Sequence, residues 1–262
     1  YKPQVTENHH PWASAEAFAL NLKLRSIAAI AEKRITFVSP SSWISNELAS
    51  SPFAQYCGSH VIPYGLDVNV YSPRDRSLIR RIFGIPDEAM VVGCIADDLS
   101  DPRKGLQQFR ASLEYYCHNV PLTLVTVGSS CPRLSGVTHF HLGSLSSDEL
   151  LASFYSACDL FVCPSLQDNL PNTVLESISC GTPVLSYAVG GLPDMVRPSI
   201  SGLTVSPTGS PSALCQGLMD LVSDPEYLSR LRVTARELAV SSYTLEMQAG
   251  RYHDLYSAVL GQ

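Results

Sequence analysis

The sequence lacks the features of several protein classes. No run of apolar residues approaches eighteen, so we expect no membrane-spanning helix. The net charge is −6 and there is no long basic run, which gives a nucleic-acid-binding role no electrostatic support. Residues 1–12 do not show the charged-then-apolar pattern of a signal peptide. They also lack an initiator methionine, so we expect the chain to be part of a longer protein.

Metal-binding and disulfide motifs are also missing. The eight cysteines include no C-x-x-C pair, and four of them lie within apolar strand or helix patterns: Cys94, Cys158, Cys163 and Cys180. A free cysteine in such a pattern packs like a small apolar side chain, so we expect buried, reduced thiols and a cytoplasmic location. His139 and His141 are two residues apart, but no third ligand has a fitting spacing, so we expect an ordinary strand face and no metal.

What the sequence does contain is an alternation of apolar and helical segments from about residue 60 onward. The expected strands span 60–63, 90–95, 122–128, 137–143, 159–165, 183–189 and 201–205, and several of them are continuous apolar runs, typical of strands covered on both faces. The expected helices between them span 104–117, 147–156, 174–180 and 211–222. Ser146 and Glu149 have the spacing of a capping box at the start of the second helix. This order predicts an α/β fold with a doubly wound parallel sheet of the Rossmann type.

The first 57 residues have a different pattern. A helical pattern over 14–33 is followed by one apolar strand, "ITFVSP", and by a short helix, "SWISNELA". Because one strand cannot form a sheet, we expect residues 1–57 to be the end of a preceding α/β domain, with a linker at 50–59. Residues 58–243 would form the Rossmann-like domain. An amphipathic helix within 244–262 would pack into a core or back toward the preceding domain.

Polar residues cluster at one predicted strand-to-helix junction, "LQDNLPNTVLES". Ligands of parallel sheets bind beyond the carboxyl ends of the strands, and a helix that starts there offers free N–H groups to a phosphate. Lys104, which follows an earlier strand, could add a positive charge, while Asp168 and Glu176 suit ligand hydroxyls. A site that binds both a diphosphate and hydroxyl-rich rings indicates a nucleotide sugar. The alternative is helix capping: Thr173 and Glu176 have capping-box spacing, and Asn172 could itself be the cap.

Several segments in one order resemble the C-terminal half of a family-4 retaining glycosyltransferase. They are "VIPYGLDVNVYSP", "DPRKG", "SDELLASFYSACDLFVCPSLQDNLPNTVLESISCGTPVLSYAVGGLPDMV" and "YTLEMQAGRYHDLY". The resemblance covers roughly residues 58–262, and "ITFVSPSSWISNELA" is similar to the last strand and helix of that family's N-terminal domain. It implies the GT-B architecture, in which two Rossmann-like domains face a cleft, and an activity that needs no metal.

The resemblance also implies roles for two acidic residues. Asp168 and Glu176 match the family's two carboxylates eight positions apart, with Asp in place of the commoner Glu at the first position. Asp168 would contact hydroxyls of the donor sugar and the positive charge that develops on it, with Asn169 beside it. Glu176 would bind the ribose of the nucleotide.

Further donor contacts follow from the same resemblance. Backbone N–H groups near Asn172, Thr173 and Val174 would meet the diphosphate, and Lys104 matches the family's phosphate-binding lysine. The backbone of Gly190 and Gly191, in "VGGLPD", would approach the donor sugar. The family usually also carries an arginine five residues before the lysine, just after the first strand, and this chain has Ala96 and Asp97 near that place. Arg103 is the candidate to replace it.

The implied reaction moves a sugar from a nucleoside-diphosphate sugar to a hydroxyl acceptor, with the anomeric configuration kept. The enzyme would be a hexosyltransferase of polysaccharide biosynthesis whose acceptor is a glycan or lipid-linked, acting in the cytoplasm or at the inner face of a membrane. The donor is a co-substrate, and no other cofactor is expected. Most of the acceptor-binding domain is not in this sequence, so we expect the chain alone to be inactive. The alternatives are a non-catalytic nucleotide-sugar-binding module and a nucleotide-sugar epimerase, whereas the absence of G-x-G-x-x-G argues against a dehydrogenase.

Overall fold

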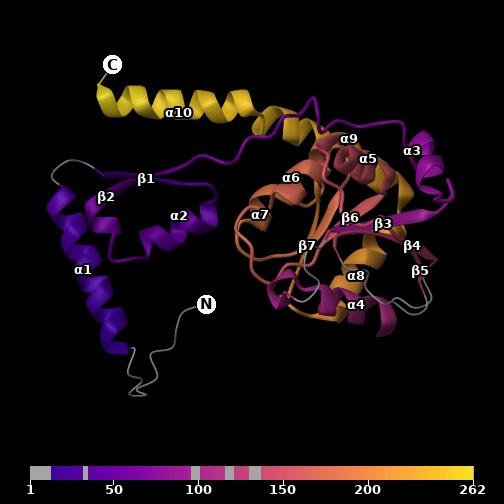
Figure 1. Cartoon of the computed structure of the whole chain (residues 1–262), viewed down its shortest axis with the longest axis horizontal. Coiled ribbons are helices and arrows are strands. Elements are labelled where there is room, and N and C mark those ends of the chain that lie inside the picture. The colour runs from indigo at the N-terminus through magenta and orange to yellow at the C-terminus, as the bar shows by residue number, and fades with distance from the viewer. Residues whose placement is uncertain (1–12, 32–34, 96–100, 116–120, 130–136, 262) are drawn as a thin grey trace.

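The computed structural model describes residues 13–31, 35–95, 101–115, 121–129 and 137–261. It contains a large unit built on a six-stranded sheet and a small unit with a two-stranded sheet (Figure 1). Every strand pair in the large sheet is parallel, and helices cover both of its faces. The predicted doubly wound α/β fold is therefore confirmed.

The large sheet has the strand order β5-β4-β3-β6-β7-β8. Its strands are β3 (Met90–Ile95), β4 (Leu122–Val127), β5 (Thr138–His141), β6 (Leu160–Cys163), β7 (Val184–Tyr187) and β8 (Gly202–Val205). The order reverses between β3 and β6, because β4 and β5 extend the sheet on one side and β7 and β8 on the other. The connections leaving β3 and β6 therefore diverge and open a crevice at the carboxyl edge, which is where such sheets bind ligands.

Two apolar layers flank the sheet. One contains Phe154 of α5 and Phe161 of β6, and the other contains Leu160 of β6 and Leu218 of α8. Helices α3 (Arg76–Phe83), α5 (Asp148–Ala157), α6 (Asn172–Ser179) and α9 (Pro225–Ser242) lie above the sheet in Figure 1, and α4 (Leu106–Tyr115) and α8 (Pro211–Val222) lie below it. Adjacent residues of β6 thus enter different layers, which explains why its sequence is continuously apolar. Full burial of each such side chain stabilises the fold by about 1.5–3 kcal/mol.

Three helices of the large unit were not among those expected from the sequence: α3, α9 and the short α7 (Leu192–Met195). The first two begin at aspartate caps, where Asp75 accepts a hydrogen bond from the Leu78 amide and Asp224 accepts one from the Tyr227 amide. The expected cap of α5 is wrong by one residue. Ser147, not Ser146, accepts from an amide of the first turn.

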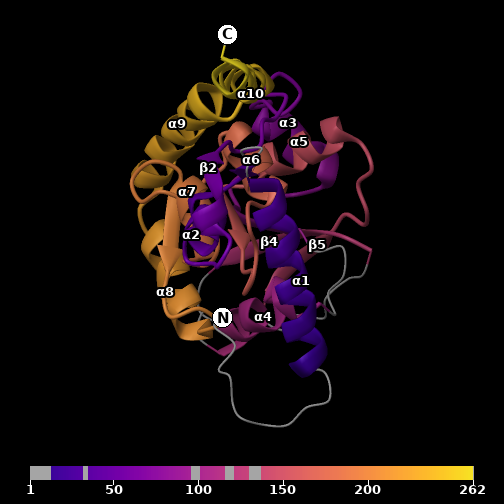
Figure 2. The same cartoon turned by 90° about the vertical axis from the view of Figure 1, so that its left-hand side faces the viewer.

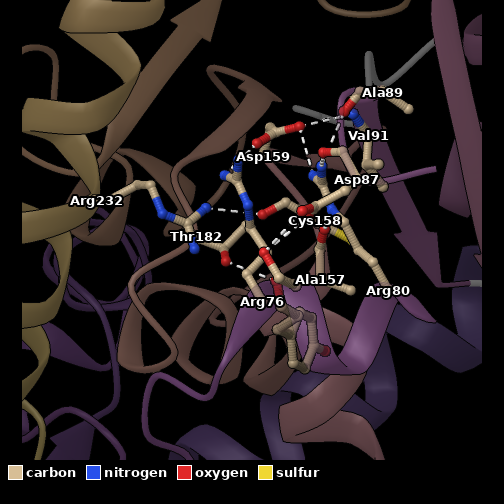
Figure 3. Close-up of polar contacts among 12 residues, drawn as sticks. Arg76, Arg80, Asp87, Ala89, Val91, Ala157, Cys158, Asp159, Thr182 and Arg232 are labelled. Carbon is tan, nitrogen blue, oxygen red and sulfur yellow. Dashed lines mark hydrogen bonds and ion pairs between the residues drawn. The ribbon is translucent and has the colours of Figure 1, made fainter. Parts of the chain in front are cut away.

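A buried ion pair joins α3 to the sheet (Figure 3). The guanidinium of Arg80, with an exposed fraction of 0%, donates to Asp159 at 2.8 Å and to the carbonyl of Ala157 at 2.9 Å. The same Asp159 oxygen accepts from the Val91 amide at 2.8 Å, and Arg76 donates to the other oxygen at 2.5 Å. Asp159 thereby links α3, the start of β3 and the start of β6.

The small unit contains α1 (Ala13–Ala31), β1 (Ile35–Ser39), α2 (Ser42–Ala49), a 3₁₀ turn at Ala54–Tyr56 and β2 (Cys57–Val61). Strand β2 pairs in parallel with β1 from Cys57 to Val61. The prediction from the sequence was a linker at 50–59 and a Rossmann-like domain that includes residues 58–61. The structure differs because these residues complete the two-stranded sheet, a pairing that local sequence does not encode.

Helix α10 (Leu245–Leu260) starts on the large unit and extends toward the small one in Figure 1. Its start is fixed to the segment that leaves β2, since Gly65 donates its amide to Gln248 at 3.1 Å and Leu66 donates to the carbonyl of Tyr243 at 2.8 Å. Figure 2 shows α1 and α2 in front of the large sheet, with α10 above them. Within the described ranges, we find no helix with the length and apolar character needed to cross a membrane.

The four cysteines predicted to be buried thiols, Cys94, Cys158, Cys163 and Cys180, are buried and free. Burial raises the pKa of the Cys163 thiol to about 11 and that of Cys180 to about 12, so both stay protonated near neutral pH. Cys215 was not among the four cysteines of this prediction, and it is disulfide-bonded.

Candidate functional site

Two of the predicted site residues meet at the crevice between β3 and β6. Lys104 ends the 3₁₀ turn Pro102–Lys104 that precedes α4, and Asp168 lies in the loop that follows β6. The ammonium of Lys104 donates to a carboxylate oxygen of Asp168 at 2.9 Å. The lysine side chain is 48% exposed and the aspartate 17%, so the positive group remains accessible to a ligand.

The carboxylate of Asp168 is held in place by its own loop. The Ser165 hydroxyl donates to one oxygen at 3.3 Å, and the Asn169 amide donates to the other at 3.0 Å. Hydrogen bonds to a carboxylate fix the direction in which it points. Asp168 therefore presents an oriented negative group beside the positive group of Lys104.

The two loops that carry this pair are in backbone contact. The Leu166 amide donates to the carbonyl of Arg103 at 2.7 Å. Gly105 has a φ of 67°, and a Cβ atom there would lie 1.8 Å from the carbonyl oxygen of Pro164. Only glycine permits this approach, so the distance between Lys104 and Asp168 is set by packed backbone.

A hollow of ≈ 220 Å³ lies at this crevice, lined by residues that include Ile95 of β3, Lys104, Ser165 and Asp168 of the two loops, and Thr173 of α6. The start of α6 faces it through Thr173. Among the described residues, no side chain caps this helix, whose N-cap is Pro171. The capping interpretation of Asn172 and Thr173 is therefore wrong, because both lie inside the first turn.

The first turn of α6 contains backbone N–H groups that could donate to a ligand. By position, the amides of Asn172 and Thr173 have no acceptor within the helix. Val174 differs, since its amide donates to the carbonyl of Pro171 at 3.0 Å and its side chain is fully buried. Of the three backbone groups predicted to meet a diphosphate, the first two are thus the better placed.

Glu176 lies one turn further along α6, and its carboxylate has a different environment. The hydroxyl of Tyr155 donates to it at 2.7 Å. Burial raises the pKa of Glu176, and the nearby charge of Asp148 acts in the same direction. Glu176 is not among the described residues that line the hollow beside Lys104 and Asp168. A role in ribose binding stays a prediction.

Gly190 and Gly191 pack against the Asp168 loop. A Cβ atom at Gly190, where φ is 57°, would lie 1.7 Å from the carbonyl oxygen of Asp168. One at Gly191 would lie 2.2 Å from the carbonyl oxygen of Asn169. This contact alone requires glycine at both positions, and an approach of their backbone to a sugar stays a prediction.

Arg103 is the predicted substitute for an arginine that the resembled family carries. Its guanidinium donates to the carboxylate of Asp101 at 2.8 Å and is largely exposed. This pairing raises the pKa of Arg103 and lowers that of Asp101. Ala96 and Asp97, at the place of the family's arginine, lie outside the described residues. Arg103 is therefore paired with Asp101 of the same turn, and a contact of Arg103 with a phosphate stays a prediction.

The small unit contributes residues that sequence reasoning missed. The hydroxyl of Ser41, the N-cap of α2, donates to the side-chain oxygen of Asn169 at 2.6 Å. The Ser42 amide donates to Asp194 at 2.7 Å. These bonds hold α2 against the loop after β6 and against α7. A second hollow, of ≈ 290 Å³, lies there and is lined by Trp43, Arg103, Lys104, Gln167, Asp168 and Asn169.

The two histidines of β5 share a hydrogen-bond partner on β4. Thr126 of β4 shares its hydroxyl with both rings, at 2.7 Å from His139 and 3.0 Å from His141. Burial lowers the pKa of His139, and the neighbouring His141 adds to this. Across the described parts of the chain, no cluster of three or more metal-ligating side chains occurs.

Comparison with known proteins points to sugar transfer. Residues 133–238 match the family model of glycosyl transferases group 1, a segment that includes Asp168 and Glu176 but not Lys104. A D-inositol 3-phosphate glycosyltransferase of Thermobispora bispora is 29% identical over 76% of this chain and 50% of its own length. An alpha-maltose-1-phosphate synthase of Mycobacterium tuberculosis is 25% identical over 76% of this chain and 57% of its own. The chain thus spans about half the length of the curated relatives it matches.

Solved structures agree on the fold. A sucrose-phosphate synthase from Thermosynechococcus elongatus matches 92% of this chain and 62% of its own, with a TM-score of 0.76 and 24% identity. HepE from Anabaena, solved in complex with UDP and glucose, matches 90% of this chain and 66% of its own, with a TM-score of 0.70 and 21% identity. These similarities show that the chain shares its fold with parts of these two structures.

Proposed function

We propose that this chain supplies the donor-binding part of a retaining glycosyltransferase, which moves a sugar from a nucleoside-diphosphate sugar to a hydroxyl group. The observation that carries the proposal is the Lys104–Asp168 pair, with 2.9 Å between the ammonium and the carboxylate, next to the first turn of α6. One cation, one helix N-terminus and one carboxylate in a single crevice match the chemistry of a diphosphate joined to a sugar.

Each group has a defined task in this proposal. Negative charge builds on the diphosphate as its bond to the sugar breaks. Lys104 and the first amides of α6 stabilise that charge, because they are already oriented before the reaction. Asp168 binds sugar hydroxyls and lies near the carbon on which positive charge develops. The nucleoside diphosphate is the leaving group, and no metal is needed if these groups neutralise it.

The nucleotide and the acceptor are further parts of the proposal. HepE, which shares the fold, binds UDP and UDP-glucose, and this makes a uridine donor and a hexosyl group the first candidates. The acceptor, a glycan or lipid-linked hydroxyl of polysaccharide biosynthesis, would bind to parts of a longer protein beyond residues 58–262. We place the reaction in the cytoplasm or at the inner face of a membrane.

A calorimetric screen tests the proposal. The chain is titrated with UDP-, GDP- and ADP-sugars and with the corresponding diphosphates, in buffer that contains EDTA. We expect one nucleotide series to bind with the chelator present. Failure of all three series to bind, or binding only after magnesium or manganese is added, would contradict the proposed site.

Glu176→Gln separates ribose binding from a structural role. Burial raises the pKa of Glu176, so the folded protein favours the protonated carboxyl. The protonated carboxyl therefore contributes stability below the ordinary pKa of 4.5, and this contribution is lost as pH rises through the pKa of Glu176 in the folded protein. At pH 7 the glutamine is neutral and can still accept from Tyr155, so we expect an unchanged or higher melting temperature. If Glu176 binds ribose, nucleotide affinity falls by about tenfold or more.

The measurements are melting temperatures at pH 7 and pH 4.5 and calorimetric affinities at pH 7. The gain in melting temperature should be larger at pH 7 than at pH 4.5. Glu246→Gln, on the exposed surface of α10, is the matched control and should change neither quantity. Parallel losses of affinity and melting temperature in Glu176→Gln would return this residue to a structural role.

A further inference from the structure

An aromatic side chain lies beside the charged pair of the candidate site. Trp43 is the second residue of α2, and it lines the ≈ 290 Å³ hollow together with Lys104 and Asp168. Its side chain is 40% exposed, although tryptophan is highly buried on average. A large ring left open next to a polar pair is typical of a surface that a ligand covers.

The position of Trp43 is fixed by its neighbours in the chain. Ser41 is fully buried, donates to Asn169 at 2.6 Å and accepts from the Ile44 amide at 3.2 Å. Gly191 lets α2 come this close, because a Cβ atom there would lie 2.7 Å from the Cβ of Ser41. The start of α2 is therefore anchored to the same loop that carries Asp168, which places Trp43 at the hollow that this carboxylate also lines.

The two hollows of the site share Lys104 and Asp168 but differ in their other walls. The ≈ 220 Å³ hollow includes Thr173 at the start of α6, where free amides suit a phosphate. The helix start beside the ≈ 290 Å³ hollow is that of α2, where the Ser42 amide donates to Asp194 and the Ile44 amide donates to Ser41. The walls of this hollow are instead one aromatic ring and several hydrogen-bonding side chains.

This combination fits a pyranose ring. A sugar ring has an apolar face of C–H groups, which suits the negative face of an aromatic ring, and a rim of hydroxyls. Asp168 and Asn169 can accept from such hydroxyls, while Lys104 and Gln167 can donate to them. The volume is near the lower end of the range of about 300–1,000 Å³ for small-molecule sites, which suits a single ring better than a whole nucleotide.

We propose that Trp43 is the platform on which the ring of the transferred sugar stacks, with the diphosphate on the other side of the Lys104–Asp168 pair. This inference rests on the proposed function, since it divides the donor between the two hollows. Trp43 would be a specificity-determining residue for the sugar. The nucleotide would make no contact with it.

The test compares each nucleotide sugar with its own diphosphate. The sequence has two tryptophans, so Trp12→Phe leaves Trp43 as the single tryptophan emitter in the chain. In this background we expect UDP-glucose, GDP-mannose or ADP-glucose to change the emission of Trp43, after correction for absorption with free N-acetyltryptophanamide. The corresponding diphosphate, bound to saturation, should leave the emission unchanged.

Affinities give the second measurement. Trp43→Leu should weaken the nucleotide sugar by about three- to tenfold and leave its diphosphate within about twofold. Trp43→Phe should recover part of the loss. Tyr256→Leu removes another exposed aromatic ring, on α10, and should change neither affinity.

Two results would overturn the platform and leave the donor site intact. In the first, the nucleotide sugar and its diphosphate change the emission of Trp43 by the same amount, or Trp43→Leu weakens the binding of both equally. Either outcome would place the base or the phosphate, and not the sugar, on the ring of Trp43. In the second, diphosphate binding persists and Trp43→Leu has no effect on either ligand. If no nucleotide binds the unaltered chain, the proposed function itself fails, and this inference fails with it.

Discussion

Lys104→Ala should weaken binding of a nucleoside diphosphate by about 1.5–3 kcal/mol, or roughly 10- to 150-fold. The ammonium of Lys104 is half exposed at the crevice and is the cation that lies beside Asp168 at 2.9 Å. Without it, a bound diphosphate would face the carboxylate of Asp168 with no intervening positive charge. The loss therefore combines a missing charged hydrogen bond with an uncompensated repulsion.

Calorimetry on the chain checks this prediction, with the melting temperature as the record of folding. The surface pair contributes little to stability, so we expect the melting temperature to change far less than the affinity. Lys23→Ala, on the exposed face of α1, is the matched control and should bind as the unaltered chain does. Unchanged affinity in Lys104→Ala would remove this residue from the phosphate site.

The sheet could be predicted from the sequence because its strands carry strong local patterns. Residues 90–95 and 122–127 are mostly apolar, and nearly all of them are buried, so the apolar pattern agrees with strands that are covered on both faces. Strand β2 could not be predicted in this way. Its residues are mostly exposed, and it exists because β1 lies beside it.

Two missed helices show a different limit. Helix α9 repeats apolar residues at helical spacing, at Leu228, Leu231, Ala235 and Leu238, so the sequence carries a signal for it. Helix α3 carries a weaker one, because its only buried residue is Arg80. No sequence pattern distinguishes a buried arginine from an exposed one, since burial here depends on Asp159, 79 residues further along the chain.

The candidate site was predictable in part. The motifs that carry Lys104 and Asp168 placed both after the carboxyl ends of strands, and the structure brings them together across 64 residues. The direction of the Glu176 side chain was not predictable, because it is set by Tyr155 on another helix. Trp43 was missed since a single tryptophan in a short polar helix has no local feature that separates a site from an ordinary surface.

Arg80→Met should lower the free energy of unfolding by about 3–5 kcal/mol, the largest stability loss we expect from one substitution in this chain. Arg80 makes its bonds at full burial, and its removal leaves Asp159 with Arg76 and the Val91 amide as partners (Figure 3). A carboxylate buried with too few partners costs more than the lost ion pair contributed. Urea unfolding, followed by circular dichroism, measures the difference.

Two further variants show whether buried charge is the cause. In Arg80→Met with Asp159→Leu, no buried carboxylate remains, and Arg76, whose side chain is 40% exposed, can be solvated by water, so part of the lost stability should return. Arg110→Ala breaks the exposed pair with Glu114 and should cost under about 0.5 kcal/mol. A loss below about 1 kcal/mol in Arg80→Met, or a double variant no more stable than the single one, would contradict the assigned role.

Comparing Arg80→Met with Lys104→Ala distinguishes the role of the amino edge of the sheet from that of the carboxyl edge. Asp159 bonds the amide at the start of β3 and immediately precedes β6, while Lys104 and Asp168 follow the opposite ends of these two strands. The ion pair at one edge thus fixes the strands from which the candidate site extends. In conditions where Arg80→Met is still folded, it should therefore bind nucleotide normally, whereas Lys104→Ala should be stable and bind poorly. Loss of binding in folded Arg80→Met would show that the amino edge influences the site beyond holding the fold.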